Sequence, residues 1–150
     1  MSEVEVSRTV RAPVERVWEV FTDLPRAAEL LSGVEKIDVL TPGGFKVGAT
    51  WRETRTLHGK TSVEQLTVTM SEPPSRYLIE AQSRGTHYKS EFTFTPEGED
   101  TLVRMTFGTE SYGAVGKVVG AVLGGLMSRA VTKTMQQDLD DLADAAEKPE

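Results

Sequence analysis

Cysteine is absent from the 150 residues of this chain, and histidine occurs only twice. The absence of thiols excludes disulfides and every metal site built on thiolates. His58 and His87 are too few to indicate a zinc site without cysteine, and their neighbours offer no ligand spacing. Each stands at a predicted strand end beside Gly59 or Gly85, so we expect exposed turn positions. The sequence therefore predicts no metal and no cofactor.

Basic residues are in the minority, and no apolar run is long enough to span a membrane. Lys and Arg number 17 against 23 Asp and Glu, a net charge of −6. This balance argues against a nucleic-acid partner, because a phosphate backbone requires a basic surface. The most apolar run, Val118 to Met127, has about half the ~20 residues of a membrane span, and the N-terminus lacks the apolar stretch of a secretory signal. We therefore expect a cytoplasmic protein.

Local signatures of common enzyme classes are also missing. No G-x-G-x-x-G or P-loop pattern occurs, which gives no support to nucleotide binding. No serine lies in a nucleophile elbow. The sequence must therefore be interpreted through its pattern of strands and helices.

The first residues predict a strand followed by two short helices. Residues 4–10 alternate apolar and polar side chains, as a half-buried strand does. Pro13 suits the first position of a helix, and the residues after it place apolar side chains on one face. A second helix is predicted from Pro25 to Leu31, with Asp23 as its cap and Gly33 as its stop.

The remainder predicts a run of strands and then one long helix. The predicted strands cover residues 34–40, 49–57, 61–70, 76–83, 87–95 and 101–109. Short breaks rich in glycine and proline separate them, which is typical of antiparallel hairpins. The stretch from about Gly113 to Glu147 contains no proline and predicts a helix. Strands followed by a helix indicate an α+β fold, and we treat residues 1–150 as one domain.

Three segments carry a resemblance to a known family. The segment RAPVERVWEVFTDLPRAAELLSGVEKIDVL is similar to an opening helix pair and second strand, and VGATWRETRTLHGKTSVEQLTVTMSEPPSRYLIEA to the next three strands. The ending MQQDLDDLADAAE is similar to a closing helix. In this order they resemble the START-related superfamily, in its polyketide cyclase/dehydrase-like branch, which shares its fold with birch-pollen-allergen-like proteins.

The resemblance implies a helix-grip fold. In this fold a curved antiparallel sheet of about six to seven strands wraps around a long C-terminal helix. Members usually hold a lipid, steroid, polyketide or other apolar compound in a deep cavity between the sheet and that helix. Some are enzymes, and many are carriers or sensors.

Alternation along the strands predicts which side chains face such a cavity. The candidates on the later strands are Tyr77, Ile79, Tyr88, Phe92, Phe94, Met105 and Phe107. Large apolar residues most often pack a core, so a plain core role is the alternative for each of them.

The long helix carries a predicted buried stripe whose first half is bare. Helical spacing places five apolar residues on one side: Met127, Val131, Met135, Leu142 and Ala146. Projected toward the N-terminus, the same side carries Gly113, Gly116, Gly120 and Gly124. The bare surface indicates either a close approach to the sheet or room for a ligand. We therefore count Gly116, Gly120, Leu123, Gly124 and Met127 as candidate ligand contacts.

The opposite side of that first half is also apolar. A kink at Gly124-Gly125 would re-aim it. An exposed apolar strip would instead mark a dimer, partner or membrane contact. A homodimer or a transient membrane contact thus stays open as a partner, beside a small apolar molecule.

The strand TWRETRTL places Trp51, Glu53 and Arg55 on one face. If Trp51 points inward, the two charged side chains enter the cavity, where they would pair and could orient a polar group of a ligand. The alternative is an exposed ion pair that contributes little to stability. Alternation does not decide which face is buried.

Three functions are compatible with these features. The first is a non-catalytic carrier or sensor that binds a lipid-, polyketide- or aromatic-like molecule. The second is an aromatase/cyclase-type enzyme in which Glu53, Arg55 or Tyr88 handles protons. The third is a partner-binding protein that uses the glycine-rich half of the helix. An apolar cavity favours the first, a deep acid–base pair the second and a filled core the third.

Overall fold

A computed structural model describes residues 2–57, 59–83, 85–111 and 113–149. The side chains of residues 2, 57, 83 and 110–128 lie outside this description, as do residues 1, 58, 84, 112 and 150. The elements in chain order are β1 (Ser2–Val10), α1 (Val14–Phe21), the 3₁₀ turn η1 (Leu24–Arg26), α2 (Ala27–Leu30), β2 (Val34–Val39), β3 (Thr50–Leu57), β4 (Lys60–Glu72), β5 (Arg76–Ser83), β6 (Thr86–Glu97), β7 (Asp100–Ser111) and α3 (Gly113–Glu147).

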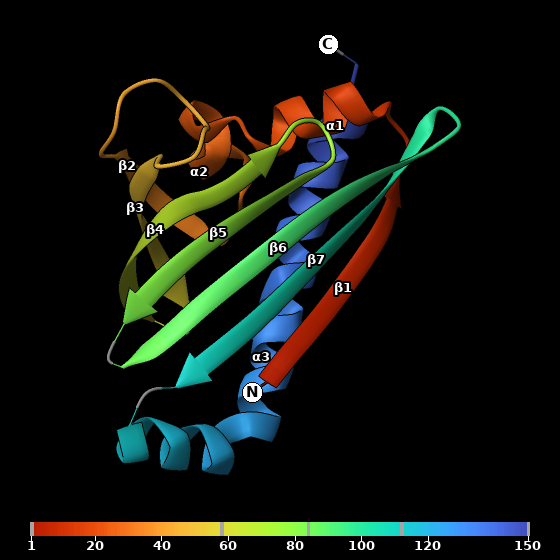
Figure 1. Ribbon diagram of the computed structural model, residues 1–150. Coiled ribbons are helices and arrows are strands. Elements are labelled where there is room, and N and C mark those ends of the chain that lie inside the picture. Colours follow the sequence, from red (N-terminus) through yellow and green to blue (C-terminus); the bar gives the residue numbers. More distant parts are fainter. Residues whose placement is uncertain (1, 58, 84, 112, 150) are drawn as a thin grey trace.

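The seven strands form one antiparallel sheet in the order β1-β7-β6-β5-β4-β3-β2. The sheet curves around α3, and α1 and α2 lie at the end of the sheet where α3 ends (Figure 1). Register shifts in β2 and in β4 mark irregular pairing, which increases local bending of a sheet. The α+β helix-grip prediction is therefore confirmed, with seven strands.

Element boundaries differ from the predictions in two ways. Strands β1, β4, β6 and β7 extend one to two residues further than predicted, because main-chain pairing continues into polar residues that show no alternation, whereas β2 and β3 are each one residue shorter. The predicted helix from Pro25 to Leu31 is instead the 3₁₀ turn η1 followed by the single turn α2. Asp23 makes no side-chain cap there, so nothing starts a regular helix at Pro25.

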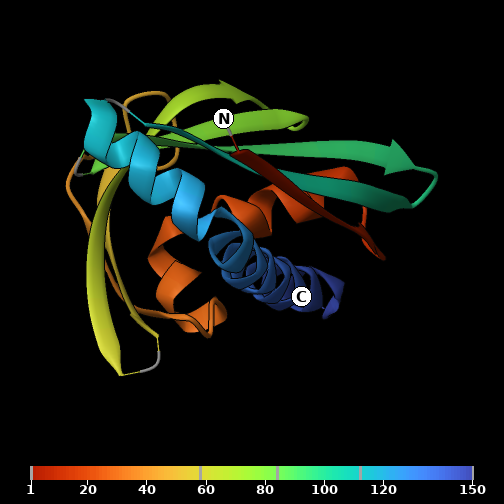
Figure 2. The same ribbon diagram turned by 90° about the horizontal axis from the view of Figure 1, so that it is seen from below.

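The long helix runs in two directions. Figures 1 and 2 show that the N-terminal part of α3 is turned away from the remainder, which lies in the concave side of the bent sheet. The predicted stripe is buried where side chains are described, at Met135, Leu142 and Ala146, with Val131 half-buried. Leu139, which is fully buried, completes the contact with the sheet.

Charged contacts hold the C-terminal part of α3 against β1. Arg8 lies on the inner face of β1, and its guanidinium donates to Asp140, Asp144 and Glu147 at 3.0–3.1 Å.

In the part of the chain that the structure describes, no helix is long and apolar enough to cross a membrane.

Candidate functional site

A cavity of about 500 Å³ lies between the inner face of the sheet and the C-terminal part of α3. Its walls come from α1, α2, strands β2 to β7, the β2–β3 loop and α3. Apolar and aromatic side chains make up most of the lining. A concave, mostly apolar space of this size is typical of a small-molecule site.

Most of the strand residues expected at the cavity do line it. They are Trp51, Glu53, Arg55, Tyr77, Ile79, Tyr88, Phe92, Met105 and Phe107. The inner face of β3 is thus the one that carries Trp51, which is 3% exposed. The tertiary structure decides this point because β3 pairs with β4 so that Leu66, on the inner face, lies opposite Trp51.

Phe94 is the described exception. Its ring packs against Trp18 and Phe21 of α1, at centroid distances of 5.6 and 5.3 Å, and is not part of the cavity lining. The strand places it on the inner face, but α1 covers the sheet at that level. Of the candidates on α3, Gly116, Gly120, Leu123, Gly124 and Met127 lie outside the residues whose side chains the structure describes.

A group of three charged side chains stands in the cavity wall. Arg55 donates from Nε to Glu53 at 2.7 Å, and from Nη1 and Nη2 to the two oxygens of Asp138 at 3.1 and 2.8 Å. The side chains of Arg55, Glu53 and Asp138 are 24%, 13% and 15% exposed, respectively, so the group is largely desolvated. The planar guanidinium matches a carboxylate in this two-bond geometry. The group joins β3 to α3.

Two neighbours border the group. The indole Nε1 of Trp51 donates to Glu53 at 3.5 Å. Gly33 stands beside Arg55, and a Cβ at that position would lie 3.1 Å from Nη1. The residue expected only to end a helix therefore also leaves room for the guanidinium.

Burial and charge shift the protonation equilibria of this group. Burial raises the pKa of the Asp138 carboxyl, the nearby Arg55 opposes the rise, and the charge of Glu53 adds to it. The pKa of Arg55 is raised by its two carboxylate partners, which together outweigh its desolvation. Arg55 is therefore a permanent cation and cannot act as a proton acceptor.

Asp138 is not among the site residues that the sequence predicts. The available signal is its place in the helix: it lies between Met135 and Leu142, on the flank of the buried stripe. An acidic residue beside a buried stripe indicates a partner in the opposing sheet. Only the tertiary structure identifies that partner as Arg55.

Glu64 adds a further carboxylate to the lining. It lies directly opposite Glu53 in the β3–β4 pairing. Counted by formal charge, the carboxylates of Glu53, Glu64 and Asp138 face one guanidinium, so this side of the cavity has a net charge of −2. Like charges in opposite positions on neighbouring strands repel each other. The same net negative charge repels an anionic ligand.

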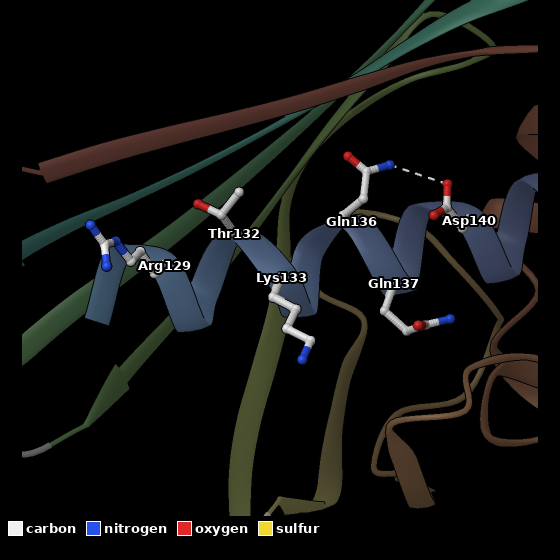
Figure 3. Close-up of a pocket in the computed structure, with 6 residues that line it drawn as sticks. All are labelled: Arg129, Thr132, Lys133, Gln136, Gln137 and Asp140. Atoms are coloured by element: carbon white, nitrogen blue, oxygen red, sulfur yellow. Dashed lines mark hydrogen bonds between the residues drawn. The ribbon is translucent and has the colours of Figure 1, made fainter. Parts of the chain in front are cut away.

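A second hollow on α3 has a different character. It is open to solvent and lined by Arg129, Thr132, Lys133, Gln136, Gln137 and Asp140. Figure 3 shows that these side chains project from α3 in different directions. The amide of Gln136 donates to Asp140 at 3.1 Å. Such pairs four residues apart are ordinary contacts on a helix surface. We therefore assign the candidate site to the enclosed cavity.

His87 does not occupy the expected turn position. It is half-buried within β6, and its Nε2 lies 2.5 Å from Glu80 of β5 on the outer face of the sheet. The strand begins one residue earlier than predicted, at Thr86, so His87 pairs with Gln82 inside the sheet rather than standing in the turn. His58 lies outside the described residues. In the described part of the chain, no three His, Asp or Glu side chains are arranged to hold a metal ion.

Comparisons with known proteins support one family. A family model described as "Polyketide cyclase / dehydrase and lipid transport" matches residues 1–147. No curated protein matches the chain. Three solved structures illustrate the likeness of fold.

The first is a protein of Thermus thermophilus, 24% identical, with a TM-score of 0.80, covering 97% of each chain. The second is an aromatase/cyclase from a Streptomyces species, 20% identical, with a TM-score of 0.74, covering 97% of this chain and 93% of the other. The third is norcoclaurine synthase from Thalictrum flavum, 14% identical, with a TM-score of 0.79, covering 99% and 95%. At these identities the similarity shows a shared fold.

Proposed function

Because the chain belongs to the polyketide cyclase/dehydrase and lipid transport family, we propose that it binds a small apolar molecule in the cavity, as a carrier or sensor. The observation that carries the proposal is the cavity of about 500 Å³ between the sheet and α3, walled mainly by apolar side chains. Its size lies within the range of roughly 300–1,000 Å³ that ligand pockets occupy. A lipid-, polyketide- or aromatic-like molecule fits this chemistry.

An aromatase/cyclase-type enzyme is the second candidate. The charged group in the wall favours it, and one protein of similar fold is an aromatase/cyclase. A catalytic cation would stabilise negative charge that develops on a substrate oxygen. However, Glu53 and Asp138 already occupy three donors of Arg55 and compensate its charge. We therefore place the carrier or sensor first.

Native mass spectrometry of the purified protein, followed by solvent extraction, tests whether a ligand is bound. A carrier or sensor should release an apolar compound whose mass is unchanged after incubation with fresh protein. Conversion with loss of one water would favour the enzyme instead. The cytoplasmic location and the homodimer or membrane contact stay predictions.

Filling the cavity should abolish binding. Ala81 lines the cavity, and the next residue, Gln82, is exposed on the opposite face of β5. We expect Ala81→Trp to weaken binding of the fluorescent probe N-phenyl-1-naphthylamine at least tenfold, or about 1.4 kcal/mol. Gln82→Trp, the matched control, should bind like the unchanged protein.

A second cavity-filling variant protects this test against misfolding. Ser90→Phe adds bulk from β6, and its thermal midpoint should be compared with that of Ala81→Trp. Full probe binding in folded forms of both variants would show that the cavity is not the binding site.

A further inference from the structure

Tyr77 stands out in the cavity lining because its ring is held on several sides. It is 2% exposed and lies on the inner face of β5. Its ring stacks on Phe92 with centroids 4.5 Å apart, and meets Phe45 and Trp18 edge-on at 4.8 and 5.6 Å. Aromatic contacts of this kind fix the ring plane and therefore the direction of the hydroxyl.

The hydroxyl of Tyr77 has no hydrogen-bond partner among the described residues. Burial alone raises its pKa, so it stays protonated and able to donate. It is also not among the fully enclosed polar atoms of the described side chains, so it keeps some contact with accessible space. The cavity is the space that Tyr77 lines.

Once an apolar ligand fills the cavity and displaces water from it, a buried hydroxyl that faces the ligand without a partner is unfavourable. Leaving such a group without a partner costs on the order of 1–3 kcal/mol, and native structures rarely leave one unexplained. Phenylalanine would fill the same place among the aromatic rings without that cost. The hydroxyl is therefore explained best by a partner that arrives with the ligand.

The surroundings of Tyr77 indicate the chemistry of that partner. Its described ring contacts are all aromatic, whereas the charged group of Arg55 lies on β3 and α3. A carboxylate placed beside Tyr77 would lack a cation, and Arg55 is already held by two carboxylates. An uncharged acceptor of the carbonyl type has no such penalty.

We propose that Tyr77 donates a hydrogen bond to an uncharged carbonyl-type oxygen of the ligand, and so fixes the ligand at the α1 end of the cavity. This inference rests on the proposed binding of an apolar molecule. It narrows the ligand class to apolar compounds with a neutral oxygen acceptor.

Tyr88 provides a matched control in the same cavity. It lies on the inner face of β6 opposite Ala81, four residues beyond Tyr77 along β5. At about 3.3 Å per residue, the two positions are roughly 13 Å apart along the sheet. Tyr88 is half-buried and its ring lies 5.8 Å from that of Phe107, so Tyr88 lies at the opposite end of the cavity wall.

Calorimetric titration with 9-fluorenone and fluorene tests the proposal, because the two rigid compounds differ by a carbonyl in place of a methylene. Tyr77→Phe should weaken fluorenone binding about five- to tenfold, the worth of one hydrogen bond, and leave fluorene binding unchanged. Tyr88→Phe, which alters the lining at the other end of the same cavity, should not discriminate between the two compounds. The thermal midpoint of Tyr77→Phe should equal or exceed that of the unchanged protein, because no internal hydrogen bond is lost.

Three results would overturn the proposal while leaving the cavity as a binding site. The first is an equal loss of affinity for fluorenone and fluorene in Tyr77→Phe, and the second is no loss of affinity for either compound. The third is a loss of affinity for fluorenone alone in Tyr88→Phe. A lower thermal midpoint for Tyr77→Phe would show that the hydroxyl is bonded within the protein, which also overturns it. If neither compound binds the unchanged protein, the proposed function fails and the role of Tyr77 fails with it.

Discussion

Asp138 and Arg55 illustrate how much one buried charged contact depends on its neighbours. Asp138 is drawn toward its neutral form by burial and by Glu53, and toward its ionised form by Arg55. Two good hydrogen bonds to Arg55 are therefore not enough to bring the pKa of the carboxyl down to its ordinary value. Desolvation, together with the charges of Glu53 and Asp141, outweighs the gain from the partner.

Removing the charge of Glu53 should lower the pKa of Asp138. A carboxyl whose folded pKa lies above its ordinary 3.8 stabilises the fold fully below that value, and this contribution is lost as pH rises through the folded pKa. Glu53→Gln should bring the folded pKa closer to 3.8 and make that loss smaller. Carbon-13 NMR titration of the Asp138 carboxyl measures the shift directly, with Glu72→Gln, at the far end of β4, as the control. An unchanged titration in Glu53→Gln would contradict the assigned cause.

At the scale of elements, two arginines attach the sheet to α3 from opposite sides. Arg8 reaches α3 from β1 at one end of the strand order, and Arg55 reaches it from β3 near the other. The cavity lies between sheet and helix, where side chains do not fill the space. Polar contacts at the sides can hold the elements together around a space that apolar packing leaves open.

Removing the cation of Arg55 should destabilise the fold. Arg55→Met leaves Glu53 and Asp138 facing each other without a counter-charge. We expect a loss of about 2–3 kcal/mol, somewhat below that of a fully buried pair because the guanidinium is partly exposed. Denaturant unfolding measures the loss. Arg52→Met is the matched control, because Arg52 lies on the same strand but is exposed on the outer face, and an equal loss in both variants would contradict the role of the charged group.

For the molecule as a whole, the cavity combines apolar walls with a negative side. Glu64 and the charged group of Arg55 give the lining more carboxylates than cations, in a chain whose net charge is already −6. A neutral apolar ligand has no net charge on which this field acts, whereas an anionic ligand is repelled by it at close range. Charge should therefore select among ligands of equal apolar size.

A direct comparison is decanol against decanoate. We expect decanol to bind at least ~10-fold more tightly, a difference of about 1.4 kcal/mol. Glu64→Gln should reduce the difference, because it removes one negative charge from the wall. Glu72→Gln, at an exposed position, should leave it unchanged. Equal affinity for the two compounds would show that the field does not reach the ligand.

Local sequence is sufficient to predict the order of the elements, the antiparallel sheet and the inner faces of β5, β6 and β7. Those features follow from hydrophobic period, turn residues and the absence of proline after Gly113. The strands at Tyr77 and Phe92 can be oriented because each has one face that is more apolar than the other, with Leu78 as the apolar exception on the outer face of β5.

The orientation of β3, the partner of Asp138 and the exclusion of Phe94 from the cavity follow from the tertiary structure alone. Each depends on residues far apart in the chain: Arg55 and Asp138 are separated by 83 positions. In β3 both faces carry charged side chains, so alternation has no apolar side to select. Which face of β3 is buried depends on which face the rest of the fold encloses. Pairing with β4 and the approach of α3 place one face inside. There Glu53 and Arg55 find the charged partners that make their burial tolerable.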